Sequence, residues 1–200
     1  MLVMDRKMSS LKYIEFVRKN LPLESVEQIL SVGLMNLSTL ISNYIPQELV
    51  KENQKILFET LVLLLNREDD STLPKDPIVD SLFSFVSNDD HLKLCLGWME
   101  ASEISVDGKV LFKLQKKHKY SILSRLFKSR GFSYDFKMDL LMKVTGDDNS
   151  DIAINTRARC MAGLPDAAMK AKVWAEITDI NSSDSVYLRT AKISGFYSWD

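Results

Sequence analysis

One apolar stripe constrains the fold of this chain more than any other feature of its sequence. One set of large apolar residues recurs at intervals of three, one, four, three, three, one and three positions: Val26, Ile29, Leu30, Leu34, Leu37, Leu40, Ile41 and Tyr44. This spacing places them on one face of an α-helix over about five turns, because an α-helix has 3.6 residues per turn. Pro46 follows and ends the pattern. The sequence therefore predicts a long amphipathic helix over residues 26–44.

Glycine and proline are scarce, with seven and five residues among 200, about half of their usual combined share of roughly 12%. Both residues break helices, and sheet-rich folds need many turns, so their scarcity favours helix. Further apolar stripes predict helices near residues 11–17, 49–65, 78–86, 92–99, 115–129, 134–145, 150–162, 166–178 and 184–196. No fixed repeat of letters accompanies these helices. The fold class predicted is all-α, an irregular α-solenoid of stacked antiparallel helix pairs similar to the HEAT and armadillo superhelices.

A single short segment has the features of β structure. In residues 104–112 an Asp-Gly pair stands between alternating apolar residues, which suits a two-residue type I′ hairpin. A plain loop between helices would explain these residues equally well. The chain is otherwise interpreted as one helical domain, residues 1–200, with a possible sub-boundary in the polar loop 67–77, which contains two prolines.

Composition excludes several classes of protein. The net charge is −1, so the whole chain is not suited to neutralising the phosphates of nucleic acid. No run of eighteen apolar residues predicts a membrane span, and the first ten residues do not resemble a signal peptide. Cys95 and Cys160 stand among apolar neighbours and are expected to be buried thiols. These features favour a cytoplasmic location.

No catalytic or metal-binding motif is found. His91 and His118 lie too far apart for a His-Glu-x-x-His zinc helix, and both are expected to be solvated surface residues. No Gly-x-Ser-x-Gly motif occurs. Residues 147–151 have the acidic spacing of a calcium loop, but Ile152 and Ala158 stand where such a loop needs Gly and Glu. This segment is interpreted as a turn followed by a helix N-cap. We therefore predict no catalytic residue, no metal ligand and no cofactor for this chain.

The charges are unevenly distributed. Residues 109–130 contain eight Lys or Arg and no Asp or Glu, whereas residues 68–90 are acidic. A basic patch could bind nucleic acid or a peptide carboxylate, and a solvated helix face is the simpler interpretation. The aromatic side chains on which nucleic-acid bases would stack are not interleaved with these cations.

From Trp98 onward, several short motifs occur in a specific order. They are Gly108-Lys109-Val110, Lys119 to Leu126, Arg130-Gly131, Asp147-Asp148, Asn155-Thr156-Arg157-Ala158, Gly163-Leu164-Pro165-Asp166, Lys170 to Trp174 and Ser194-Gly195-Phe196. In this order they resemble the C-terminal helical domain of zinc aminopeptidases of the aminopeptidase N and puromycin-sensitive type. The resemblance covers residues 98–200, about half of the chain.

The resemblance implies a right-handed stack of helix pairs that closes over the active site of a peptidase. Members of this family remove N-terminal residues from peptides. Their catalytic domain binds zinc through His-Glu-x-x-His and a distant Glu, and the peptide N-terminus through Gly-x-Met-x-Asn; neither motif occurs here. The chain would thus be a C-terminal fragment of a larger enzyme, with that enzyme's catalytic domain and peptide substrates as partners. Basic side chains of this domain can meet the substrate carboxylate in relatives, which suggests Lys116, Lys117 and Lys119.

Two other functions remain open at this point. A free-standing helical-repeat scaffold for protein–protein interaction explains the missing catalytic groups equally well, but not the ordered motifs from Gly108 to Phe196. Nucleic-acid binding through residues 109–130 is opposed by a net charge near zero.

Overall fold

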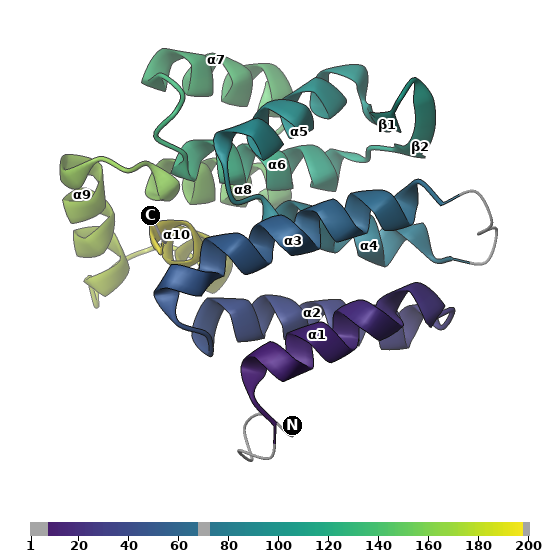
Figure 1. The fold of residues 1–200 in the computed structure, drawn as a ribbon. Helices are drawn as coiled ribbons and strands as arrows, with labels where there is room; N and C mark the ends of the chain where they lie inside the picture. The colour runs from purple at the N-terminus through teal and green to yellow at the C-terminus, as the bar shows by residue number, and fades with distance from the viewer. Residues whose placement is uncertain (1–7, 68–72, 198–200) are drawn as a thin grey trace. The chain divides into compact units, whose positions relative to one another are not determined.

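The computed structural model describes residues 8–67 and 73–197 (Figure 1). The chain forms two compact units, Met1–Leu114 and Gln115–Asp200. The described residues form ten α-helices, two short 3₁₀ helices and one two-stranded sheet. The all-α fold class with one short hairpin is therefore confirmed. The expected sub-boundary at residues 67–77 lies within the first unit, and residues 68–72 of it lie outside the described residues. The boundary between the two units falls between Leu114 and Gln115.

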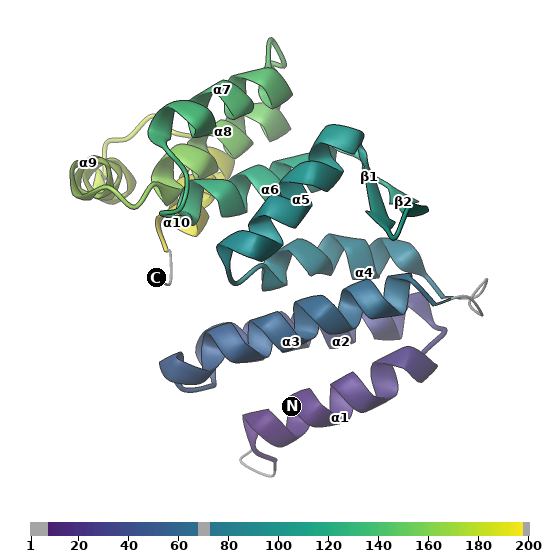
Figure 2. The same cartoon turned by 45° about the horizontal axis from the view of Figure 1, so that its top comes forward.

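The first unit is a layer of packed helices followed by a hairpin. Its elements are α1 (Ser10–Asn20), η1 (Leu21–Leu23), α2 (Glu27–Asn43), α3 (Gln47–Leu65), α4 (Lys75–Leu82), η2 (Phe83–Phe85), α5 (Asp89–Ala101), β1 (Glu103–Val106) and β2 (Lys109–Lys113). Helices α1 to α4 lie side by side (Figure 2). The long helix predicted at residues 26–44 is confirmed as α2, whose buried residues Leu30, Leu34, Leu37, Leu40 and Ile41 all belong to the apolar stripe. The stripe therefore forms the core contact of α2 with its neighbours.

The Asp-Gly pair closes a β-hairpin, as one of the two interpretations of residues 104–112 predicted. Strands β1 and β2 pair antiparallel, and Asp107 and Gly108 both have positive φ, at 50° and 79°. Positive φ at both central residues is the requirement of a type I′ turn. The Nε1 of Trp98 donates a hydrogen bond to the carbonyl of Ser105 at 2.9 Å, which ties α5 to the hairpin.

The second unit contains five helices joined by short loops. They are α6 (Lys116–Lys128), α7 (Tyr134–Thr145), α8 (Asp151–Gly163), α9 (Ala167–Thr178) and α10 (Val186–Phe196). Helix α8 packs against α6 on one side and α10 on the other. The hydroxyls of Ser133, Ser150 and Ser185 and the carboxylate of Asp166 accept hydrogen bonds from the first turns of α7 to α10.

Both histidines are buried, which corrects the expectation that they are solvated. His91 is 8% exposed and stacks on Phe58 with ring centroids 4.1 Å apart. His118 is 1% exposed, and its Nδ1 accepts a hydrogen bond from the backbone N–H of Gln115 at 3.0 Å. The prediction was wrong because each histidine lies on the inward face of its helix, which local charge does not reveal.

Candidate functional site

Helix α6 carries most of the basic stretch within the second unit, and both of its ends are capped by side chains. At its start Gln115 and His118 form a reciprocal capping box. At its end the Nζ of Lys137 donates hydrogen bonds to the carbonyls of Phe127, at 3.3 Å, and Ser129. Lys137 is only 3% exposed, so its charge is held against the negative end of the α6 dipole. These caps therefore fix the first and last residues of α6, and with them the positions of its basic side chains.

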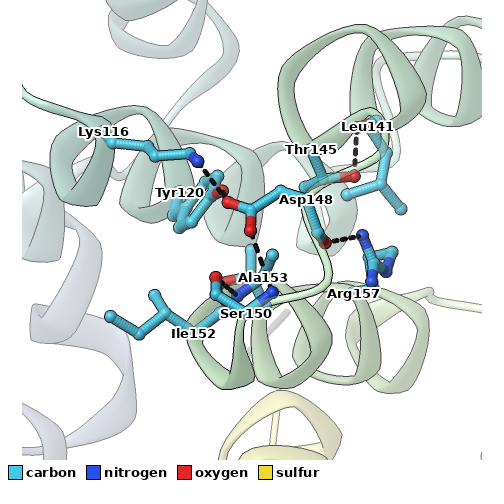
Figure 3. Close-up of polar contacts among 10 residues, drawn as sticks. Lys116, Tyr120, Leu141, Thr145, Asp148, Ser150, Ile152, Ala153 and Arg157 are labelled. Atoms are coloured by element: carbon cyan, nitrogen blue, oxygen red, sulfur yellow. Dashed lines mark hydrogen bonds and ion pairs between the residues drawn. The ribbon is translucent and has the colours of Figure 1, made fainter.

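The first predicted site residue, Lys116, is paired with a carboxylate. Its Nζ forms an ion pair with Asp148, and the hydroxyl of Tyr120 donates to the same carboxylate oxygen at 3.0 Å (Figure 3). The ammonium also lies 5.9 Å from the centroid of the Tyr120 ring. The hydrogen bond to Asp148 raises the pKa of Lys116. The positive charge of Lys116 is therefore balanced within the unit.

Asp148 lies between α7 and α8 and connects α6 to α8 through hydrogen bonds. The hydrogen bond from Lys116 and that from the backbone N–H of Ser150, at 2.9 Å, hold the pKa of Asp148 well below its usual range. The Asp148 carbonyl accepts a hydrogen bond from the guanidinium of Arg157 at 3.0 Å. The segment interpreted as a turn and N-cap thus connects the start of α6 to the start of α8. We name Lys116, Tyr120 and Asp148 the α6 clamp.

Lys117 and Lys119, the other two predicted site residues, also lie in the first turn of α6. Lys117 is exposed and Lys119 is half-buried, and both interact with other residues of the protein. Positions three apart share a helix face, whereas adjacent positions do not, so Lys119 lies on the side of Lys116 and Lys117 points elsewhere. The three lysines therefore do not converge on one point.

A groove of about 450 Å³ lies at the other end of α6. One wall consists of Arg130 and Phe132 in the α6–α7 loop with Tyr134 and Lys137 from α7. The opposite wall consists of Leu164, Pro165, Asp166 and Met169, from the α8–α9 turn and the first turn of α9. This volume lies in the range of about 300–1,000 Å³ that is typical of small-ligand sites.

Arg130 differs from the neighbouring cations of α6. It is exposed, and among the residues that the structure describes its guanidinium has no hydrogen bond or ion pair. By contrast, Lys128 donates hydrogen bonds to the carbonyls of Ser194 and Tyr197, at 3.2 and 3.0 Å. The guanidinium of Arg130 thus remains available to a ligand in the groove, while Lys128 caps α10.

Sequence reasoning counted Arg130 in the basic stretch but did not select it. The local signal was an arginine followed by Gly131 and two aromatic residues, Phe132 and Tyr134, just before a helix. The opposite wall begins at Leu164, more than thirty residues further along the chain. Only the packing of α8 against α6 and α7 brings these walls together.

Both cysteine side chains lie inside the fold. Burial raises the pKa of the Cys160 thiol to about 12 and also raises the pKa of the Cys95 thiol, so both are neutral thiols near neutral pH. The expectation that these thiols are buried is confirmed. Across residues 8–67 and 73–197, no three His, Cys, Asp or Glu side chains are grouped to hold a metal ion.

Comparison with known proteins adds no relative. No model of a known protein family matches the sequence, and a search of curated proteins finds no similar one. No helix within the described part of the chain has the length and hydropathy needed to cross a bilayer. The ordered motifs and the geometry of the second unit are therefore the observations that bear on function.

Proposed function

We propose that this chain is a non-catalytic helical domain of a zinc aminopeptidase, which encloses the peptide chamber and restricts access to it. The parent enzyme would remove N-terminal residues from peptides. A wall of packed helices would serve this role because enclosure excludes water and folded proteins from the reaction centre. The observation that carries the proposal is the order of the motifs between Gly108 and Phe196 in an all-α chain.

The positions of these motif residues support the proposal. Thr156 is 3% exposed on α8, and Gly163 and Gly195 lie where α8 approaches α6 and α10. Asp166 caps α9, and the Nζ of Lys170 donates hydrogen bonds to the carbonyls of Ala162 and Phe196 at 2.8 and 2.6 Å. Residues with such roles are needed by any chain that forms the same helix stack. The resemblance is thus concentrated in residues that would preserve a shared fold.

The first test examines the natural protein. We expect an in-frame zinc signature, His-Glu-x-x-His with a distant Glu, upstream of Met1 in the full-length transcript. The full-length enzyme should hydrolyse an aminoacyl reporter, whereas the purified 200-residue chain should hydrolyse none and retain no stoichiometric zinc. Turnover by the 200-residue chain, or one tightly held zinc per chain, would contradict the proposal.

A second test examines the basic end of α6. In the full-length enzyme, the double variant Lys117→Gln/Lys119→Gln should lower kcat/KM for peptides and leave kcat/KM for a small aminoacyl reporter unchanged. The reason is that only a peptide is long enough to reach a wall remote from the reaction centre. Equal losses for both substrates would indicate a general folding defect.

A helical scaffold for protein–protein interaction is the alternative, and one observation favours it. Helix α10 exposes Val186 and Tyr187 by 79% and 78%, and Ile193 and Tyr197 are also exposed along the same helix and its end. Exposed apolar stripes commonly mark interaction surfaces. A transcript in which translation begins at Met1, without a zinc signature, would favour the scaffold over the peptidase domain.

A further inference from the structure

We propose that the groove between the α6–α7 loop and the α8–α9 turn binds a peptide segment in which a large apolar side chain stands beside a carboxylate. This inference deepens the proposed function, and it rests on that function only in taking the ligand to be a peptide. The site differs from the first turn of α6, where the sequence analysis expected peptide contact.

The carboxylate is assigned to Arg130. Arg130 lines the groove, and its guanidinium makes no hydrogen bond or ion pair among the described residues. A free guanidinium has its donors in a planar fork that matches the two oxygens of a carboxylate. Lys116 is less suited to this task, because a ligand carboxylate would have to displace Asp148 from it.

The charges around the groove favour an anionic ligand. Arg130 and Lys137 contribute two positive charges and Asp166 one negative charge, so their sum is +1. The carboxylate of Asp166 already accepts a hydrogen bond from the backbone N–H of Met169 at 2.7 Å. Helices α7 and α9 both begin at the groove, and the positive ends of their dipoles add to the attraction.

The apolar side chain is assigned to the opposite wall. Leu164, Pro165 and Met169 provide an aliphatic surface, and the aromatic residues Phe132 and Tyr134 line the same groove. Phe132 is held by stacking on Phe136, with centroids 5.6 Å apart. Tyr134 is 53% exposed, so a ligand ring could cover it and remove apolar surface from water. An apolar residue next to a carboxylate matches both walls at once.

Isothermal titration calorimetry of the 200-residue chain would test the assignment with three acetylated peptides. The first, acetyl-Ala-Ala-Phe, has a free C-terminal carboxylate. The second, acetyl-Ala-Phe-Asp-Ala-amide, has its only carboxylate on a side chain. The third, acetyl-Ala-Ala-Phe-amide, is neutral. We expect saturable binding of at least one acidic peptide, about tenfold tighter than the neutral peptide, because a charge-assisted hydrogen bond is lost with the carboxylate. The tighter acidic peptide would identify the source of the carboxylate.

Variants with matched charge separate the groove from the basic end of α6. Arg130→Gln should weaken the binding of the acidic peptides by about tenfold and change the affinity for the neutral peptide by less than about twofold. Tyr134→Ala should weaken all peptides that bind. Lys117→Gln removes the same charge from the other end of α6, and a loss of affinity for the acidic peptides larger than that of Arg130→Gln would overturn the assignment. Arg130 and Tyr134 are exposed, so circular dichroism should show both variants folded.

The location of binding is measured independently by amide chemical shifts. Saturating the chain with the tighter acidic peptide should shift residues 130–137 and 164–169. Equal affinity of the neutral and acidic peptides, unchanged affinity in Arg130→Gln, or shifts confined to the first turn of α6 would overturn the assignment. If the full-length protein is an aminopeptidase but the groove binds no acidic peptide, the proposed function stands and the peptide site does not. If the natural protein has no catalytic domain and the groove still binds the acidic peptide, the peptide site stands and the proposed function does not.

Discussion

The Cα of Gly195 on α10 faces the carbonyl group of Arg159 on α8 so closely that a Cβ at residue 195 would stand 2.1 Å from that oxygen. The same Cβ would lie 3.0 Å from the Cβ of Ala162. Ala162 and Ala191, also on α8 and α10, are almost completely buried. The two helices therefore approach through small residues, and only glycine fits at residue 195.

Gly195→Ala should destabilise the second unit by at least ~2 kcal/mol, because the added methyl meets backbone that cannot rotate away. Gly97→Ala is the matched control, since a Cβ there has no neighbouring atom within 4 Å. In the interior of α5 that control should be neutral or stabilising by up to ~1 kcal/mol. Urea unfolding followed by circular dichroism measures both variants. Equal stability of the two would refute the close approach of α8 and α10.

His91 should make the stability of the first unit depend on pH. Burial lowers the pKa of His91 below 6.5, with Glu59 opposing this shift. Between the two pKa values the unfolded chain binds more protons than the folded chain. The contribution of His91 to stability is therefore complete above about pH 6.5 and is lost as the pH falls from 6.5 toward the lower pKa of the folded state. The Nδ1 of His91 has no partner among the described residues. His91→Phe keeps a ring on Phe58 and should flatten the dependence between about pH 5 and 7. Urea unfolding across that range would measure the free energy of unfolding of both proteins. The same pH dependence in the unaltered chain and in His91→Phe would exclude His91 as the cause.

The α6 clamp should contribute most between the ordinary pKa values of its two charged groups, 3.8 for Asp148 and 10.5 for Lys116. The Asp148 pKa is lowered on folding, so its contribution disappears as the pH falls below 3.8. The Lys116 pKa is raised, so its contribution disappears as the pH rises above 10.5. Asp148→Asn should lower the Tm more than Lys116→Gln, since Asp148 also binds Tyr120 and Ser150. Thermal unfolding at pH 7 compares them, and the reverse order would show that Lys116 acts elsewhere.

Lys192 should stabilise the connection between α9 and α10. Its Nζ lies 2.8 Å from Glu176 and 2.6 Å from Asp184, and its side chain is 16% exposed. Lys192→Met leaves two neighbouring carboxylates without a counter-ion and should cost about 1–3 kcal/mol. Lys55→Met breaks the exposed pair with Glu59, 4.0 Å apart, and should cost less than about 0.5 kcal/mol. Chemical denaturation distinguishes the two, and similar losses would mean that the Lys192 pairs are solvated.

Local patterns predicted most of the secondary structure. The apolar stripe at residues 26–44 became α2, and the Asp-Gly pair became the turn between β1 and β2. Both signals depend on neighbours in the chain, namely helical periodicity and the conformation that a two-residue turn requires. The resemblance to the aminopeptidases and the roles of Lys117 and Lys119 remain predictions.

The sequence by itself determined that this chain is helical, where most helices lie, and that its glycines and prolines stand at few positions. Tertiary packing alone decided that His91 and His118 are buried, that Lys116 is balanced by Asp148, and that Arg130 and Leu164 line the same groove. The physical reason is the separation along the chain of the residues that interact. Helix periodicity is set by residues three or four positions apart, whereas burial and charge pairing depend on residues that are distant in the chain and meet only when the helices pack.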